Sequence, residues 1–478
     1  MNNTFSRARI EKDSNFDGEF FFAVKTTGIF CRPSCPAPVA LEKNVVYFNS
    51  LFEALDAGFH PCHRCRPDIS LEYHRGHLAG ADRIQRGLKL IFEGFLNYHS
   101  LEELARELLV SPRHLRTLFN DRLGLPPVKI ARYHKALFAR KLIIESDMKI
   151  TQAAMAAGFR STRQFNETYR SLFGESPSTS RKGTPRRGNI FLLKYSRPFN
   201  FQQILEFMRP RAITGVEIIT KDEFTRTFRL GVATGYFSVV DNTDLSALEL
   251  RIVTDDLPCC MEIYYRIRRV FDLDTDYSRI NQMFSDDPIL SSGMRGGCVP
   301  GLPAAFNPFE FAIRAVLGQQ VTVKAATTLA GRIAAEAGIQ CADGFPEGLA
   351  YFFPNPAELL KTDIRALGIT GTRQETIRRI AHAVVEDRLR FNSGQSFDEF
   401  NDSFSSLKGI GSWTVNYVAM RGLGMIDSFP ASDLGIIRIL SPPDQKLPEK
   451  KILEIAERWR PYRAYAALCL WERFTNGK

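Results

Sequence analysis

The stretch LKGIGSWTVNYVAMRGLG, at residues 407–424, carries the clearest structural signal in the chain. Gly409 and Gly411 permit a tight turn in which main-chain amides approach a ligand closely, and a helix begins directly after them. Amides at the start of a helix favour an anion. The stretch therefore predicts a turn at Gly409, Gly411 and Thr414 that suits a phosphate group, although two glycines before a helix are also common in ordinary turns.

A single acidic residue follows this hairpin at a fixed distance. Asp433 lies twenty residues after Trp413, in the stretch SFPASDLG at residues 428–435, directly after a proline-containing loop. An aspartate before a helix is most often its N-cap. From these residues alone, Asp433 is either a cap or a functional carboxylate.

Four of the nine cysteines form two close pairs near the N-terminus. Cys31 and Cys35 are separated by three residues, and Cys62 and Cys65 by two. Two such pairs complete a tetrahedral thiolate site for one Zn²⁺. The site could be purely structural, because a domain of about 80 residues has little core. Alternatively, a zinc-bound thiolate stays ionised and nucleophilic, and its alkylation would remove one negative charge and act as a switch.

The positive charge of the chain is confined to its middle. The formal net charge is +10, and all of this excess falls within residues 81–190. The same segment contains a repeated plan of short helix, tight break and second helix, at 101–119 and 150–173. A repeated helix-turn-helix in a basic segment predicts DNA binding, with an αα-hairpin pair as the alternative. The predicted contacts to DNA are Arg113, Arg116, Arg163 and Gln164.

The composition is that of a globular protein of about three domains, with 478 residues of which 44% are hydrophobic. We expect no membrane partner, because no run approaches the roughly 18 apolar residues that a membrane helix needs. The start MNNTFSRARIEKD has no apolar core and does not resemble a secretory signal. The expected location is the cytoplasm, in association with the nucleoid.

The N-terminal motifs resemble a known family. FFAVKTTGIFCRPSC at 21–35 and AGFHPCHRCRPD at 57–68 are similar to the N-terminal domain of Ada proteins, which accepts a methyl group from DNA methylphosphotriesters. The resemblance implies that Cys31 is the methyl acceptor and that all four cysteines hold Zn²⁺. Residues 80–180, including GFRSTRQFNETYRSLFGESPS at 158–178, resemble the AraC-type double helix-turn-helix. The string PCHR at 61–64 also occurs in O6-alkylguanine methyltransferases, but here it lies inside the zinc motif, so that assignment is rejected.

The C-terminal half resembles a second family. The hairpin and the Asp433 stretch, with RAVLGQQVTV at 314–323 and ERWRPYRAYAALCLW at 457–471, are similar to AlkA-type 3-methyladenine DNA glycosylases of the helix-hairpin-helix superfamily. The resemblance starts near residue 191, and 195–212 fits the strand-rich N-terminal subdomain. It implies that Asp433 is catalytic and that the base pocket is formed by Phe207, Trp413, Tyr417 and Trp471.

The second resemblance also carries three departures. Trp413 stands where bifunctional relatives have a Schiff-base lysine, which predicts hydrolysis without strand cleavage. Gln320 stands where the family often has a leucine that fills the gap in the duplex. Ser432 stands where relatives can carry a second acid, which would affect the substrate range.

Together these features predict a multidomain α+β protein. The expected parts are a small zinc-bound α/β domain at 1–78, an all-α double helix-turn-helix domain at 80–182, a linker at 183–190, a strand-rich α+β subdomain at 191–298 and an all-α helix-hairpin-helix glycosylase domain at 299–478. The predicted function is bifunctional: a transcriptional regulator activated by methyl transfer to Cys31, and a monofunctional 3-methyladenine DNA glycosylase. Expected partners are DNA with alkylated bases or methylphosphotriesters, promoter DNA and RNA polymerase. Two alternatives stay open, namely a transcription factor whose C-terminal half only binds DNA, and a glycosylase with a purely structural zinc site.

Overall fold

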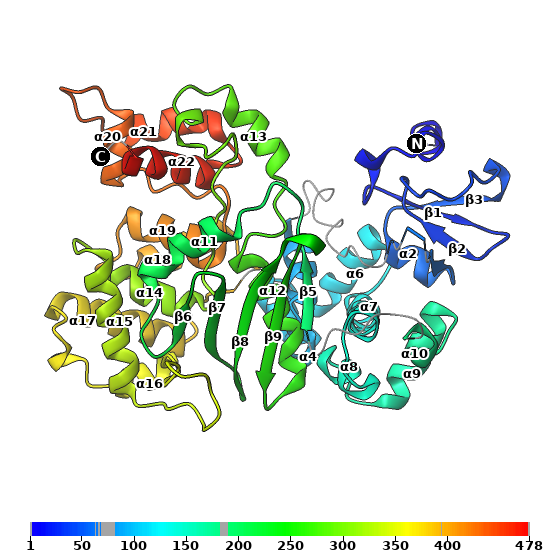
Figure 1. The fold of residues 1–478 in the computed structure, drawn as a ribbon, viewed down its shortest axis with the longest axis horizontal. Coiled ribbons are helices and arrows are strands. Elements are labelled where there is room, and N and C mark those ends of the chain that lie inside the picture. The colour runs from blue at the N-terminus through cyan, green and yellow to red at the C-terminus, as the bar shows by residue number, and fades with distance from the viewer. Residues whose placement is uncertain are drawn as a thin grey trace. The chain divides into compact units, whose positions relative to one another are not determined.

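The computed structural model describes residues 2–62, 64, 65, 67, 82–181, 190–392 and 394–476. The chain forms two compact units, residues 1–191 with 256–265 and residues 192–255 with 266–478 (Figure 1). Both units mix helices with a sheet, and helices predominate, which confirms the predicted α+β class. The predicted linker at 183–190 lies, except for Ile190, outside the described residues, as does the predicted boundary at 78–80.

The N-terminal part of the first unit is a four-stranded sheet in the order β3-β1-β2-β4. β1 (Phe21–Val24) pairs antiparallel with β2 (Ile29–Cys31) and with β3 (Val45–Phe48), and β4 (His60–Pro61) lies parallel to β2. The helix α1 (Asn2–Glu11) precedes the strands in sequence, and α2 (Leu51–Asp56) lies between β3 and β4. The consecutive aromatic residues Phe20, Phe21 and Phe22 are all buried, and they supply much of a small core.

The remainder of the first unit is helical and contains the repeated motif. The first copy is α5 (Leu101–Glu107) with α6 (Pro112–Leu123), and the second is α8 (Ile150–Ala156) with α9 (Thr162–Phe173). The long helix α7 (Pro127–Glu145) joins them. α6 and α9 each begin at a serine N-cap and end at a glycine in the left-handed region, Gly124 and Gly174. Three further helices in the described residues of this part are α3 (Asp82–Phe92), α4 (Phe95–Tyr98) and α10 (Pro177–Ser180).

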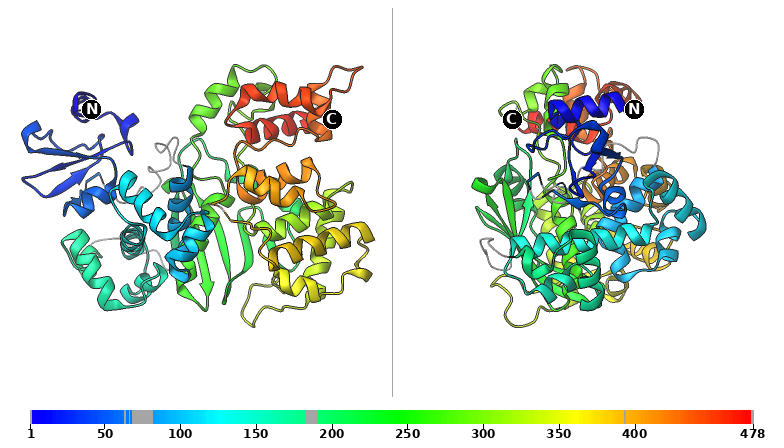
Figure 2. Two further views of the ribbon diagram at one scale, coloured as in Figure 1. Left: turned by 180° about the vertical axis from the view of Figure 1, so that it is seen from behind. Right: turned by 90° about the vertical axis from the view of Figure 1, so that its right-hand side faces the viewer.

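A five-stranded antiparallel sheet, in the order β5-β9-β8-β7-β6, opens the second half of the chain (Figures 1 and 2). Its strands are β5 (Ile190–Lys194), β6 (Glu217–Ile219), β7 (Glu223–Leu230), β8 (Ala233–Asn242) and β9 (Ala247–Thr254). Polar and apolar residues alternate over 216–230, a pattern typical of strands, and the structure forms two strands there, β6 and β7. The chain turns at residues 220–222, where the Thr220 amide donates to the Glu223 carbonyl at 3.0 Å.

The helices of the second unit surround two hydrophobic cores. One core involves α14, α15, α17, α18 and α19, and the other involves α13, α20, α21 and α22. Among the helices in the described ranges, none is long and apolar enough to cross a membrane. The bounds are α11 (Phe201–Met208), α13 (Tyr277–Ser285), α14 (Pro308–Leu317), α15 (Val323–Ala337), α16 (Pro356–Lys361), α17 (Gly371–Val385), α18 (Phe397–Ser405), α19 (Ser412–Leu423), α20 (Leu434–Leu440), α21 (Glu449–Ala456) and α22 (Arg463–Asn476). The helix α12 (Cys260–Val270) is divided, because residues 260–265 belong to the first unit and 266–270 to the second.

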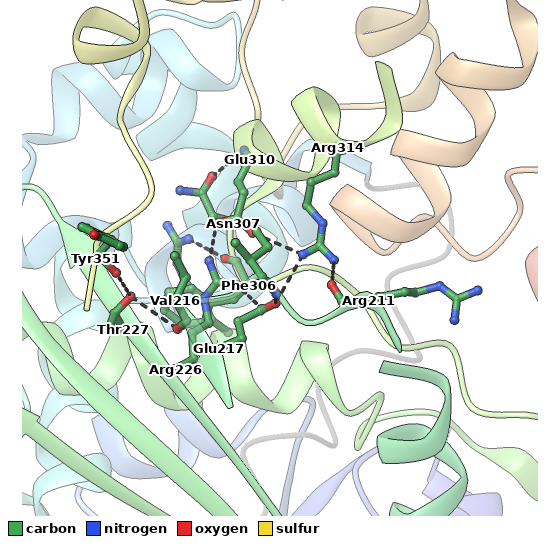
Figure 3. A network of polar contacts seen from close by, with 12 residues as sticks. Arg211, Val216, Glu217, Arg226, Thr227, Phe306, Asn307, Glu310, Arg314 and Tyr351 are labelled. Atoms are coloured by element: carbon green, nitrogen blue, oxygen red, sulfur yellow. Dashed lines mark hydrogen bonds and ion pairs between the residues drawn. The ribbon is translucent and has the colours of Figure 1, made fainter. Parts of the chain in front are cut away.

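A buried ion cluster fastens the sheet to the helices (Figure 3). Arg226 on β7 pairs with Glu217 on β6 and with Glu310 on α14, and each of the three side chains is at most 6% exposed. Arg314 on α14 reaches both carboxylates, at 3.6 Å and 3.4 Å. Burial alone would lower the pKa of Arg226, but Glu310 and Glu217 raise it above its usual value. The cluster therefore stays charged within the fold.

Candidate functional site

The glycine hairpin has the turn that its sequence predicts. It connects α18 to α19, and Gly409 has φ +101°, a conformation that favours glycine. A Cβ atom at Gly409 would lie 2.2 Å from Oγ1 of Thr376 on α17, so close packing also requires glycine there. Gly411 is the N-cap of α19 and has no side-chain cap, so the first amides of α19 lack a side-chain partner.

The side chain of Thr414, the third residue predicted to bind phosphate, points into the protein. Its side chain is buried, and its hydroxyl accepts a hydrogen bond of 3.2 Å from Nε2 of Gln319. The same Gln319 amide donates to the Gly409 carbonyl at 3.2 Å. The Thr414 side chain therefore fixes the hairpin, and only its main-chain amide, in the first turn of α19, remains to meet a phosphate.

Asp433 is both a helix cap and a pocket residue. As the N-cap of α20, its Oδ1 accepts the amides of Gly435 at 2.9 Å and Ile436 at 3.2 Å. Two indole groups complete its contacts, because Trp471 Nε1 donates to Oδ1 and Trp413 Nε1 donates to Oδ2, each at 3.0 Å. Four donors thus hold the carboxylate in one orientation. The cap that the sequence predicts is confirmed, and the functional role of Asp433 stays a prediction.

Asp433 lies on the wall of a cavity of about 810 Å³ in the second unit. Trp413 and Tyr417 stack at 4.8 Å between ring centroids, with planes 18° apart, and Trp471 meets Tyr417 edge-on at 6.2 Å. The cavity is large enough for a purine and its sugar, and electron-rich rings favour a cationic ligand. The four predicted pocket residues, Phe207, Trp413, Tyr417 and Trp471, all line this cavity.

Two arginines lie over the ring of Phe207, the remaining aromatic residue of the cavity. The guanidinium of Arg211 lies 3.9 Å from its centroid and that of Arg421 lies 4.6 Å away. Burial lowers the pKa of both arginines, to about 10 for Arg421. Because guanidinium groups already contact the Phe207 ring, Trp413, Tyr417 and Trp471 are the rings better placed to stack on a base.

The four N-terminal cysteines form a closed cluster. Their Sγ atoms lie within 4.8 Å of one another and all four side chains are buried. Cys31 ends β2, Cys35 lies in the turn after it, and the Cys62 amide donates to the Phe30 carbonyl at 3.0 Å, next to the β2–β4 pairing. Four thiolates at these separations suit the tetrahedral site of one Zn²⁺. The chemistry and spacing of the donors therefore fit this metal.

Main-chain hydrogen bonds distinguish Cys31 from its neighbours. Cys62 Sγ accepts the Arg64 amide at 3.4 Å, and amides of Ala37 and Arg32 lie against Cys35 and Cys65 respectively. Within the described part of the chain, no main-chain donor contacts the Cys31 sulfur. A thiolate without such a donor keeps more electron density, which is a property that favours reaction with an alkyl group.

The predicted DNA contacts of the first unit are exposed on its second helices. Arg113 and Arg116 lie on α6, and Arg163 and Gln164 lie on the first turn of α9. Arg163 pairs with the exposed Glu167, one turn further on. Phe165, Tyr169 and Leu172, spaced four and three residues apart, form the buried apolar face of α9.

Gln320 is exposed and has φ +56°, an uncommon conformation for a residue other than glycine. It lies in the turn between α14 and α15, next to Val321, which lines the cavity. Arg373 donates to the carbonyl of Gln319, which fixes this turn. An exposed side chain at this place could contact DNA near the opening of the cavity. The predicted DNA contact of Gln320 stays a prediction.

Sequence reasoning missed three residues of these sites. Arg211 lines the cavity, Gln319 holds the hairpin, and Asp17 accepts hydrogen bonds from the amide and hydroxyl of Ser34 between the first two cysteines. The sequence signals were weak, because Gln319 and Asp17 act on segments at least 17 residues away, and Arg211 shares the cavity with residues of α19. Only the position of Arg211 four residues after Phe207, in FMRPR at 207–211, could have suggested a pocket role.

Comparison with known proteins agrees with this architecture. Three family models match the chain: the metal binding domain of Ada at residues 4–68, a helix-turn-helix domain at 104–183 and the AlkA N-terminal domain at 190–307. A probable bifunctional transcriptional activator/DNA repair enzyme AlkA of Mycobacterium tuberculosis is 34% identical over 97% of this chain and 95% of its own length.

The second half has relatives of its own. DNA-3-methyladenine glycosylase 2 of Escherichia coli is 29% identical over 60% of this chain and 98% of its own length. The 3-methyladenine DNA-glycosylase of Archaeoglobus fulgidus superposes with a TM-score of 0.51 at 21% identity, covering 60% of this chain and 99% of that one, which shows a common fold.

The fold and the cysteine cluster define the class: a zinc-binding, helix-turn-helix protein fused to an AlkA-type half. This confirms both resemblances and the single-zinc prediction. More particularly, the chain belongs to the family of the bifunctional transcriptional activator/DNA repair enzyme AlkA, to which the mycobacterial relative is similar over nearly its whole length.

Proposed function

We propose that this protein both repairs alkylated DNA and regulates the response to it. The second unit would act as a 3-methyladenine DNA glycosylase, and the first as a DNA-binding regulator that accepts methyl groups from methylphosphotriesters. The observation that supports the enzyme most directly is the orientation of Asp433, which four donors hold at the wall of an aromatic cavity.

The carboxylate of Asp433 suits hydrolysis of an N-glycosidic bond. Purines alkylated at N3 or N7 are cationic and leave readily, so the enzyme mainly needs to stabilise the positive sugar that develops and to admit a water molecule. The base must leave the duplex to reach the cavity. Trp413, Tyr417 and Trp471 would hold it, while the Gly409 and Gly411 amides would hold the strand.

Strand cleavage requires an amine that forms a Schiff base with the sugar. The indole of Trp413 occupies the predicted position of that amine, and its N–H is engaged by Asp433. No lysine lines the cavity among the residues described for it. We therefore expect base release by water without lyase activity.

Cys31 is the proposed methyl acceptor of the first unit. Bound zinc would keep the sulfurs ionised at neutral pH. The Cys31 sulfur then forms a bond to the methyl carbon, the bond from that carbon to the phosphotriester oxygen breaks, and the oxygen leaves as a phosphodiester anion. The cluster loses one negative charge, which would strengthen the attraction of the first unit to promoter DNA. RNA polymerase is a further proposed partner, and the proposed location is the cytoplasm, with the nucleoid.

Base release from methylated duplex DNA tests the enzyme. Asp433→Asn should lower the rate at least about a thousandfold while DNA binding persists, since the amide keeps the cap but removes the charge. Release near the parent rate would refute the assignment of Asp433. Heating with alkali should be needed to break the product strand, and breaks without it would disprove the monofunctional mechanism.

Mass analysis of peptides tests the methyl acceptor. After exposure to DNA that carries methylphosphotriesters, the Cys31 peptide should gain one methyl group, and Cys31→Ser should abolish transfer. Cys341→Ser, at a half-buried cysteine outside the cluster, is the control and should leave transfer unchanged. Methylation of Cys35, Cys62 or Cys65 in the parent would show that the acceptor is wrong.

A further inference from the structure

A small cavity, separate from the base cavity, is lined by the buried ion cluster and by the end of α19. Its volume is about 40 Å³. The charged part of its wall consists of four arginines and two glutamates, namely Arg211, Arg226, Arg314, Arg421, Glu217 and Glu310, and apolar side chains form the rest. The positive charges of this wall therefore exceed the negative charges by two.

Both carboxylates of this wall are already paired. Glu217 pairs with Arg226 and Arg314, and Glu310 pairs with the same two arginines (Figure 3). Neither of the other two arginines of the wall forms an ion pair with a described residue. The pairs within the cluster thus leave two guanidinium charges without a counter-charge.

Two buried N–H donors of the same wall have no hydrogen-bond partner among the described residues. They are Nη1 of Arg421 and Nε of Arg226, and these residues are only 5% and 4% exposed. Nearly all buried polar groups in proteins have a partner, and a buried charge is costly unless it is compensated. Arg421 lies on α19 and Arg226 on β7, so donors from two elements share one cavity and call for an acceptor between them.

The arginines cannot relieve this excess by losing protons. Burial, with the like charges of Arg211 and Arg314, lowers the pKa of Arg421 to about 10, while Tyr417 opposes the shift. Because this pKa is still well above neutral pH, the guanidinium group stays charged. A bound anion would supply both the missing charge and the missing acceptor.

We propose that this cavity is a binding site for one chloride ion, which accepts N–H groups of Arg421 and Arg226. A cavity of roughly 10–15 Å³ already holds one water molecule, so the volume is sufficient for chloride, which is only slightly larger. A monovalent ion also loses less hydration energy on burial than a divalent one, which disfavours sulfate and phosphate. The inference does not rest on the proposed glycosylase activity.

The bound ion would connect the sheet to the helix that carries two rings of the base cavity. Arg226 belongs to β7, whereas Arg421 belongs to α19, which also carries Trp413 and Tyr417. The ion cluster itself joins β6 and β7 to α14 only. Chloride would therefore extend this electrostatic connection to α19 and stabilise the folded second unit.

Unfolding of the full chain in urea tests the site, because urea adds no chloride. Tryptophan emission reports on the second unit, to which all three tryptophans belong. Sodium gluconate replaces sodium chloride at constant ionic strength. Above the dissociation constant, each tenfold rise in chloride should raise the ratio of folded to unfolded protein about tenfold, since one ion binds the folded state alone. The urea midpoint should rise with an unchanged slope.

Arg421→Met removes one charge and one donor from the wall, and it should abolish the chloride dependence. Arg209→Met is the matched control, because Arg209 is exposed, donates to the Thr220 carbonyl and does not line the cavity. It should keep the full dependence. Met208→Glu is a second variant in case Arg421→Met does not fold, since Met208 is half-buried and lines the cavity. Its carboxylate would replace the ion, abolish the dependence and raise the midpoint in gluconate.

Crystals grown with bromide in place of chloride give a direct test, because bromide scatters X-rays anomalously. One anomalous peak should lie between Arg421 and Arg226. The inference is overturned by a parent protein whose stability does not respond to chloride, or by a folded Arg421→Met variant that responds as fully as the parent. A bromide crystal with only water in the cavity would overturn it as well.

Discussion

The buried ion cluster between the sheet and α14 gives the sharpest stability prediction. Glu310→Gln keeps the size of the side chain but removes its charge. In the parent, two arginines and two carboxylates balance, with Glu310 at 3% and Arg226 at 5% exposure. In the variant, a neutral amide would face the two guanidinium groups, and one positive charge would be uncompensated.

The loss of stability in Glu310→Gln follows from the burial of the charges that remain. Removing one partner of a buried pair typically costs about 3–5 kcal/mol, because the other charge stays desolvated. Arg211 and Arg421, which have no ion-pair partner among the described residues, lie around the same small cavity as the cluster and add to the excess positive charge. We therefore expect Glu310→Gln to lower the free energy of unfolding of the second unit by about 4 kcal/mol.

Tryptophan fluorescence of the full chain can measure this change in the free energy of unfolding. All three tryptophans, Trp413, Trp459 and Trp471, belong to the second unit, so their emission follows the unfolding of that unit alone. Denaturation with guanidinium chloride should move to a lower midpoint with an unchanged slope.

An exposed pair supplies the control. Glu386 meets Arg388 with both side chains at least half exposed, and Glu386→Gln should cost less than about 1 kcal/mol. If Glu310→Gln costs no more than this control, the cluster does not hold the sheet to the helices, and the electrostatic reasoning is wrong.

Three further predictions concern the metal, the hairpin and pH. Chelation of zinc, or Cys62→Ala, should abolish bound metal and expose residues 2–62 to proteolysis, while tryptophan emission stays unchanged. Gly409→Ala should cost about 1–3 kcal/mol and weaken DNA binding, because its Cβ would lie 2.2 Å from Thr376 at positive φ, whereas Gly411→Ala meets nothing within 4 Å and should fold normally. Burial raises the pKa of Asp272 to about 6 from 3.8, so the folded state favours the protonated form and loses stability as pH rises from about 4 to 6. Compared with Asp272→Asn, the parent should lose up to about 3 kcal/mol over that range, as measured by tryptophan emission, and parallel pH profiles would contradict this.

Much of the architecture could be predicted because its signals are local. The spacing of Cys31, Cys35, Cys62 and Cys65 specifies a thiolate site wherever the chain brings the two pairs together, and sulfur chemistry then selects zinc. The repeated helices are defined by apolar faces and by serine and glycine caps, which act within a few residues. The glycine hairpin is equally local, since φ +101° at Gly409 needs glycine whatever surrounds it.

Other features could not be read from neighbouring residues. The alternation at 216–230 does not reveal that the chain turns back at 220–222, because either face of a short strand can be buried. The sequence predicts that Asp433 is a helix N-cap, and in the structure it caps α20. Its contacts with Trp413 and Trp471 depend on residues 20 and 38 positions away.

The sequence by itself determined the parts of this protein: a thiolate metal site, a double helix-turn-helix with a basic surface, and a glycine hairpin followed by an aspartate. The reason is that cysteine spacing, helix periodicity and glycine conformation act over short stretches of chain. Only the tertiary structure decided which side chains share the cavity, and with what charge. Arg211, Tyr417 and Asp433 are far apart in sequence, and their mutual electrostatics arise only when packing brings α11, α19 and α20 to one wall.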